Sequence, residues 1–144
     1  MWYTYYQHFQ KFADVVLLDQ RGTGQSAPNM RTKSKLKLPL DKLLTEKESR
    51  EALYNFMKST RQELIDRGID LNAYNTKESA ADLDDLRKAL GYSKISIWGQ
   101  SYGSHLGLTY LKYYGQKVDK AILGGVNGLN QRLRMPLVQW GLSS

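Results

Sequence analysis

The stretch that decides the fold is Lys94-Ile95-Ser96-Ile97-Trp98-Gly99-Gln100-Ser101-Tyr102-Gly103. Its first half is an apolar run that predicts a strand, and residues 101–114, followed by Gly115, predict a helix. The turn between them fits Gly-x-Ser-x-Gly, a pattern that is common by chance. Its position between a strand and a helix gives it weight, because a sharp turn there exposes the serine hydroxyl above a sheet.

Ser101 is therefore the candidate nucleophile. The sharp turn requires a strained backbone at the serine, and we expect glycine at positions 99 and 103 to relieve crowding against the neighbouring strand and helix. The N-terminus of the helix directs free N–H groups toward a developing negative charge, so the amide of Tyr102 is the candidate oxyanion donor. In the competing interpretation, Ser101 is only a helix N-cap at a closely packed junction.

The rest of the chain alternates apolar strands with amphipathic helices. Two further buried strands are expected at residues 14–19 and 118–123. One helix is expected from a capping box at Thr45 to a stop at Gly68, and another from Asn75 or Thr76 to Gly91. The aromatic first dozen residues are interpreted as a core-packing helix or loop. This order predicts the α/β class, with a parallel sheet and right-handed crossovers.

A second glycine motif follows the strand at residues 14–19. Gly22-Thr23-Gly24-Gln25-Ser26-Ala27 fits the dinucleotide-binding pattern Gly-x-Gly-x-x-Gly/Ala. That motif must open a helix on which the pyrophosphate rests, whereas here Pro28 and a basic stretch intervene before helical periodicity resumes. We therefore expect no nucleotide cofactor.

The chain has 144 residues and a formal net charge of +7, which permits attraction to nucleic acid or anionic lipid. The densest basic stretch alternates with small, polar or leucine residues, as in a solvated loop or an edge strand. No aromatic residues interleave there to stack on bases, so we expect no nucleic-acid partner. Anion or nucleic-acid binding through this stretch stays a weaker alternative. Its members are Arg31, Lys33, Lys35 and Lys37.

Cofactor and membrane signals are weak. The absence of cysteine and the presence of only two histidines argue against a metal site. No stretch approaches the roughly 18 apolar residues of a membrane span. The first residues also lack the layout of a signal peptide. No compartment and no oligomeric state follow from the sequence.

Several segments resemble one branch of a known family, the prolyl aminopeptidase and tripeptidyl aminopeptidase branch of the α/β-hydrolases. The string Asp19-Gln20-Arg21-Gly22-Thr23-Gly24 is the most specific of them. The others are residues 73–87, 98–104 and 118–123, so the resemblance covers most of the chain. It fails mainly in the basic stretch and in the helix that begins near Thr45.

This resemblance implies the α/β-hydrolase fold and a serine, acid and histidine triad in that chain order. It also implies a peptide or small ester or amide substrate, with release of amino acids or short peptides from a free N-terminus. An esterase or lipase is the alternative within enzymes, because the same turn serves both chemistries and the substrate-selecting lid is not in the chain.

The triad partners are not evident after Ser101. The only later acidic residue, Asp119, lies at the start of an expected strand, and the only later histidine, His105, matches a packing position of the family. Asp19 is expected to tie down the turn around Arg21, and His8 belongs to no motif.

We therefore expect residues 1–144 to be the central portion of a single catalytic domain, without its N-terminal strands, lid and C-terminal strands. Such a piece would be inactive alone. The alternative outside enzymes is a truncated product without catalysis.

Overall fold

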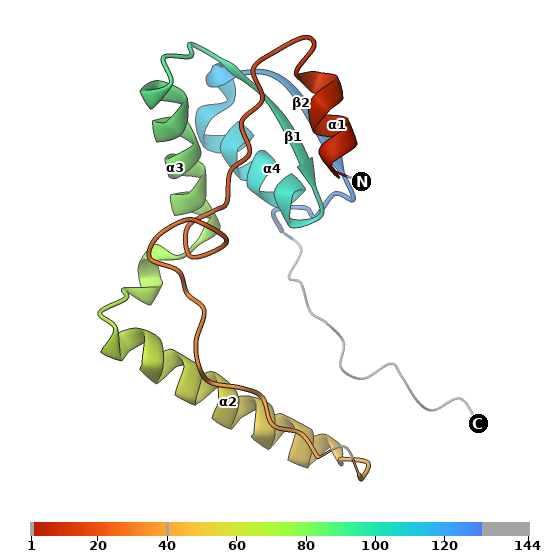
Figure 1. Cartoon of the computed structure of the whole chain (residues 1–144), viewed down its shortest axis with the longest axis vertical. Helices are drawn as coiled ribbons and strands as arrows, with labels where there is room; N and C mark the ends of the chain where they lie inside the picture. Colours follow the sequence, from red (N-terminus) through yellow and green to blue (C-terminus); the bar gives the residue numbers. More distant parts are fainter. Residues whose placement is uncertain (1, 40, 131–144) are drawn as a thin grey trace, which may run out of the picture. The chain divides into compact units, whose positions relative to one another are not determined.

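The computed structural model describes residues 2–39 and 41–130, with the backbone alone for residues 2–5. The described residues form two compact units that divide between Tyr74 and Asn75. The first unit contains helix α1 (Trp2–Phe9), helix α2 (Glu46–Asp66) and the short 3-10 helix η1 (Leu71–Ala73). The second contains α3 (Thr76–Ala89), strand β1 (Ile95–Gln100), α4 (Tyr102–Tyr114), η2 (Gly115–Lys117) and strand β2 (Val118–Gly124) (Figure 1).

Helix α2 begins at the predicted capping box. The Glu48 N–H donates to the Thr45 hydroxyl at 3.2 Å, and the Thr45 N–H donates back to the Glu48 carboxylate at 2.8 Å. The hydrogen bonds that the Glu48 carboxylate accepts, first from the Thr45 N–H and then from the Lys42 ammonium and the Thr45 hydroxyl, lower the pKa of Glu48 to about 2. The helix ends before Gly68, which adopts φ +74° as a glycine stop requires.

The basic stretch is a loop that runs beside α2 (Figure 1). The N–H groups of Lys33 and Ser34 donate to the Glu63 carboxylate at 2.8 and 3.2 Å. Arg67, just past the end of α2, donates to the carbonyl oxygens of Asn29 and Arg31. The loop interpretation is confirmed, because this segment takes its partners from α2 rather than from another strand.

Two expectations for the first unit are wrong. Residues 14–19 are not a strand, and the side chain of Leu17 is 76% exposed. A strand exists only when its backbone pairs, and no described segment of this unit pairs with it. The aromatic segment is not all core either, since Phe12 is 80% exposed.

The second unit is an α/β layer built on two parallel strands. β1 pairs with β2, with Ile97 opposite Ala121 and Gln100 opposite Gly124. Helix α4 connects them and packs on the sheet, and α3 lies beside α4 (Figure 1). A β-carbon on Gly107 would lie 2.8 Å from a methyl carbon of Leu123, so glycine there permits the close helix–sheet approach.

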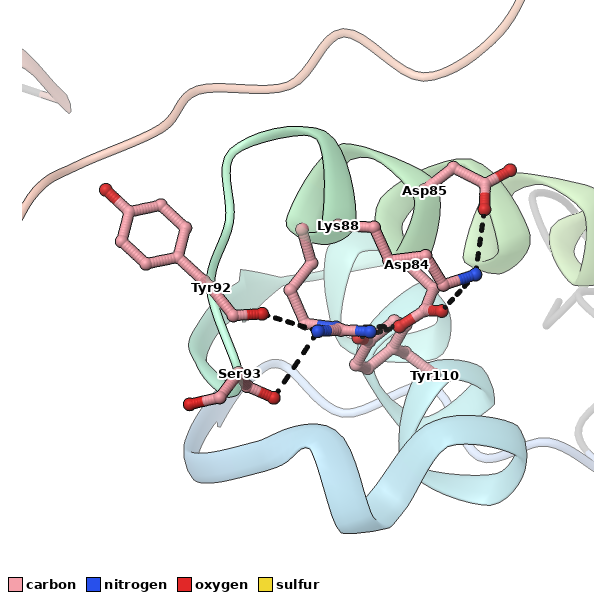
Figure 2. Close-up of polar contacts among 7 residues, drawn as sticks. Asp84, Asp85, Lys88, Tyr92, Ser93 and Tyr110 are labelled. Atoms are coloured by element: carbon pink, nitrogen blue, oxygen red, sulfur yellow. Dashed lines mark hydrogen bonds and ion pairs between the residues drawn. The ribbon is translucent and has the colours of Figure 1, made fainter.

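A buried ionic network joins α3, α4 and the turn before β1 (Figure 2). The Asp84 carboxylate accepts hydrogen bonds from Arg87 Nε at 2.8 Å and from the Tyr110 hydroxyl at 3.0 Å. Arg87 also donates to the carbonyl oxygen of Tyr92. The Asp84 carboxylate therefore binds α4 directly through Tyr110, and it binds the turn before β1 indirectly through Arg87.

Candidate active site at the turn between β1 and α4

Ser101 has an unusual backbone. Its φ of 53° and ψ of −120° make it the one non-glycine residue with positive φ among residues 2–39 and 41–130. A side chain in that region is strained, and such strain persists only where the surroundings enforce it. Ser101 occupies the N-cap position of α4 but makes no side-chain cap hydrogen bond, so its side chain does not cap the helix.

The two flanking glycines differ in their surroundings. A β-carbon on Gly99 would lie 2.3 Å from the carbonyl oxygen of Gly103, which is an impossible contact with the backbone. A β-carbon on Gly103 would meet nothing within 4 Å in the described structure. The expected crowding is therefore confirmed at position 99 and wrong at position 103, because the first turn of α4 presents its carbonyl, not a Cα–H, to the end of β1.

The end of β2 supports the turn from one side. The Ser101 N–H donates to the carbonyl oxygen of Gly124 at 3.0 Å, one step beyond the Gln100–Gly124 pair of the ladder. Gly125 follows with φ +56°, and a β-carbon on it would lie 3.7 Å from the Ser101 nitrogen. Ser101 thus lies at the carboxyl edge of two parallel strands, where α/β proteins bind ligands.

The residue after the serine opens α4. The Tyr102 N–H has no acceptor within the helix, because no helical turn precedes it. The phenol hydroxyl of Tyr102 lies 3.0 Å from the Thr76 hydroxyl at the start of α3. The Tyr102 N–H is therefore the first backbone N–H of α4 and directly follows Ser101 in the chain.

Ser104 was not singled out by the sequence. It is 0% exposed, and its hydroxyl lies 2.6 Å from the Ser101 carbonyl oxygen. The Asn127 N–H donates to the same hydroxyl at 3.0 Å. A short polar residue in an amphipathic helix carries no sign of such contacts, although the pair Gly124-Gly125 directly after a predicted strand could have indicated a close backbone approach.

Two other candidate residues are Asp119, which lies at the far end of β2 from Ser101, and His105, which contacts a backbone carbonyl oxygen. Asp119 forms an exposed ion pair with Lys120 at 3.3 Å, near the amino end of β2. That end lies roughly 16 Å along the strand from the Ser101 edge, at about 3.3 Å per residue. His105 Nδ1 lies 3.3 Å from the carbonyl oxygen of Asn127, a contact that fits a packing role.

The glycine-rich loop of the first unit is held by Asp19. Its carboxylate accepts the Gln25 N–H at 2.9 Å, and its carbonyl oxygen accepts the Ser26 hydroxyl. Arg21 donates to the carbonyl oxygen of Ala73 at 2.6 Å. The expected structural role of Asp19 is confirmed. No helix opens in this loop, because the next one in the described chain is α2.

The described residues contain no group of three or more acidic, histidine or cysteine side chains that could hold a metal ion. None of their helices combines the length and apolar character needed to cross a bilayer.

A family model described as the alpha/beta hydrolase fold matches residues 1–143. The chain belongs to the α/β-hydrolase fold family. The predicted fold class is confirmed, in the form of a partial parallel sheet with flanking helices.

The chain is 33% identical over 121 residues to a serine protease of Mycobacterium tuberculosis. It is 29% identical over 112 residues to a probable proline iminopeptidase of Streptomyces coelicolor, and 30% identical over 120 residues to a tripeptidyl aminopeptidase of Streptomyces lividans. The predicted resemblance to the aminopeptidase-like branch is confirmed. The matches cover 78%, 78% and 81% of this chain, but only 23%, 24% and 22% of those relatives.

Proposed function

We propose that Ser101 is the nucleophile of a serine peptidase that releases amino acids or short peptides from the N-terminus of its substrate. The observation that carries this proposal is the positive φ of Ser101 between β1 and α4. Such strain at an exposed serine has no packing purpose, whereas it lifts a reactive hydroxyl clear of the sheet. The names of the relatives, a serine protease, a probable proline iminopeptidase and a tripeptidyl aminopeptidase, support peptide hydrolysis.

In the proposed reaction, the Ser101 Oγ attacks the carbonyl carbon of the scissile peptide while a histidine takes its proton. The Tyr102 N–H donates to the oxyanion that forms. The C–N bond then breaks as the histidine returns the proton to the leaving amine. Water next attacks the acyl-enzyme and regenerates the serine.

We further propose that residues 1–144 are the central portion of one catalytic domain, with the triad acid and histidine supplied from outside them. Asp119 lies at the wrong end of β2, and His105 is engaged with the Asn127 carbonyl. His8 lies on α1 in the other unit and belongs to no motif. The isolated chain should therefore hydrolyse substrate negligibly.

Two kinds of leaving group fit this site, because a serine on a strand–turn–helix of this kind serves ester as well as peptide cleavage. The esterase or lipase alternative predicts faster turnover of p-nitrophenyl esters than of aminoacyl and tripeptidyl p-nitroanilides with a free amine. The peptidase proposal predicts selective turnover of the anilides and its loss when their amine is acetylated.

The test is labelling by a fluorophosphonate probe in the full-length protein that contains these residues, with the modified peptide mapped. We expect labelling at Ser101, its loss in Ser101→Ala, and its retention in Ser96→Ala, which changes an exposed serine of β1. Absence of labelling at Ser101 would refute the proposal and favour a product without catalysis. Strong Ser101-dependent labelling of the isolated 144 residues would refute the need for an external histidine.

A further inference from the structure

The hydroxyl of Ser104 connects three parts of the turn region. Ser104 Oγ lies 2.6 Å from the carbonyl oxygen of Ser101, 3.4 Å from that of Gly125 and 3.0 Å from the N–H of Asn127. The residue is completely buried, so water does not compete for these partners. The residues following β2 are therefore bound to the first turn of α4 through one side chain.

The direction of these hydrogen bonds follows from the chemistry of a hydroxyl, which has one proton to donate. The proton goes to Ser101 at 2.6 Å, because 3.4 Å to Gly125 is beyond a good O–H···O distance. A lone pair of the same oxygen accepts the Asn127 N–H. The Ser104 N–H also donates to the Ser101 carbonyl oxygen, at 2.9 Å, so that oxygen accepts two bonds from one residue.

Fixing the Ser101 carbonyl also fixes the neighbouring amide. The carbonyl of Ser101 and the N–H of Tyr102 belong to one peptide group, which is planar and trans, so the two point in opposite directions. Any rotation that turns the carbonyl away from Ser104 turns the Tyr102 N–H by the same angle. Rotation of this peptide would relieve strain in the Ser101 backbone, and the hydrogen bond from the Ser104 hydroxyl opposes that rotation.

We infer that Ser104 is a positioning residue: its hydroxyl orients the Tyr102 N–H toward the oxyanion and holds residues 125–127 against the nucleophile turn. This inference rests on the proposed function, because it assigns Tyr102 as oxyanion donor. Ser104 touches no substrate and acts only through the peptide of its neighbours. Its effect should therefore appear in the transition state, where charge develops, and not in substrate binding.

The ordinary alternative is a buried helix serine that bonds to a carbonyl of the preceding turn and contributes only stability. The chain contains a matched example in Thr109, which is nearly buried on α4 and donates to the carbonyl oxygen of His105 at 2.8 Å. Thr109→Val removes a hydroxyl of the same kind from the same helix but leaves the peptide after Ser101 untouched.

The experiment uses the full-length protein that contains this chain, in its unmodified form and as Ser104→Ala, Ser104→Thr and Thr109→Val. The rate of fluorophosphonate labelling, kcat and KM for a free-amine anilide substrate, and Tm are measured for each. We expect Ser104→Ala to lower kcat and the labelling rate about tenfold, less than the roughly 100-fold typical when an oxyanion donor is removed outright. KM should stay unchanged. Ser104→Thr, which keeps the hydroxyl, should restore most of the rate, and Thr109→Val should lower Tm without lowering kcat.

Equal kcat in Ser104→Ala and Thr109→Val would overturn the inference while labelling of Ser101 leaves the proposed function standing. No labelling of the unmodified protein would overturn both. If Ser104→Ala does not fold, Ser104→Cys takes its place, because a thiol is a weak donor that keeps the side chain. An unmodified rate in Ser104→Cys together with a tenfold loss in Ser104→Thr would then overturn the inference, since the rate would follow size and not hydrogen bonding.

Discussion

Gly99 and Gly103 lie so close together that a β-carbon on Gly99 would stand 2.3 Å from the Gly103 carbonyl oxygen. The β-carbon is fixed to the main chain and its neighbour is a backbone oxygen, so no side-chain rotation can relieve the contact. The end of β1 and the first turn of α4 therefore lie close together on either side of Ser101. The geometry of the serine is therefore set by a close approach of the main chain, which only glycine at position 99 permits.

We predict that Gly99→Ala destabilises the chain. The new methyl must push the start of α4 away from β1, and overpacking of this kind costs about 1–3 kcal/mol. Chemical denaturation followed by circular dichroism measures the free energy of unfolding. The same variant should lose labelling at Ser101 in the full-length protein, because the turn no longer closes.

Gly103→Ala is the matched control. A β-carbon there meets nothing within 4 Å in the described structure, and alanine is favoured over glycine within a helix by roughly 0.5–1 kcal/mol. Stability should be unchanged or slightly raised. A loss at position 103 as large as that at position 99 would show that the crowding argument is wrong.

Ser101→Gly should stabilise the protein while removing the candidate nucleophile. Glycine adopts positive φ without strain, so the substitution should recover about 1–3 kcal/mol of backbone strain, reduced by the greater freedom of glycine in the unfolded chain. Urea denaturation of the variant measures the net change, and labelling at position 101 should vanish.

Ser96→Gly provides the comparison on an ordinary residue of β1. It should lower stability by roughly 0.5–1 kcal/mol, because glycine loses more conformational freedom on folding than serine does and there is no backbone strain at this position for it to relieve. Opposite signs at positions 96 and 101 would show that the strain at Ser101 is real. A loss of stability at both positions would contradict it.

Features that depend on nearby residues were predictable from the sequence. The capping box joins Thr45 to Glu48, the Asn75 side chain caps α3 three residues on, and Gly68 ends α2, all through contacts within one helical turn. The turn between β1 and α4 belongs to this group, because Gly99 and Gly103 lie only four residues apart in the sequence.

Features that depend on distant partners were not predictable. Residues 14–19 have the composition of a buried strand, but composition does not supply the neighbour with which a strand pairs. The Ser104–Asn127 hydrogen bond joins residues 23 positions apart, and neither residue type predicts it. The asymmetry between Gly99 and Gly103 likewise depends on the direction in which each Cα–H points, which the motif does not encode.

The Asp84 network should make stability depend on acid pH. Hydrogen bonding from Arg87, opposed by burial, holds the pKa of the Asp84 carboxyl well below its usual range. Because folding lowers this pKa, its contribution is fully present above the unfolded value of about 3.9 and is lost as pH falls below that value. Urea denaturation between pH 2 and 7 measures it.

Asp84→Asn should remove that acid-dependent part and lower stability at neutral pH by about 3–5 kcal/mol, because Arg87 is left buried without its partner. Asp85→Asn is the control, since Asp85 is an exposed neighbour that pairs only with Lys88 among its described contacts. It should change stability by less than about 1 kcal/mol. Similar losses in both variants would show that the network is not the source.

The Tyr110 hydroxyl should titrate late. Burial, together with the hydrogen bond to Asp84, raises the pKa of Tyr110 to about 12. Folding therefore favours the protonated phenol, so its contribution to stability is fully present below the unfolded value of about 10 and is lost as pH rises toward 12. Absorbance at tyrosinate wavelengths, followed from pH 9 to 13, should show a final step that coincides with loss of helical circular dichroism.

Tyr110→Phe should remove that final step, because the ring remains while the ionising group is gone. It should also make stability fall less steeply between pH 10 and 12, because the proton that Tyr110 releases on unfolding is no longer coupled to folding. Tyr113→Phe, on the exposed side of the same helix, should lower the total absorbance change and leave the final step in place. A final step that survives Tyr110→Phe would assign it to another tyrosine and would contradict the buried Asp84–Tyr110 hydrogen bond as its cause.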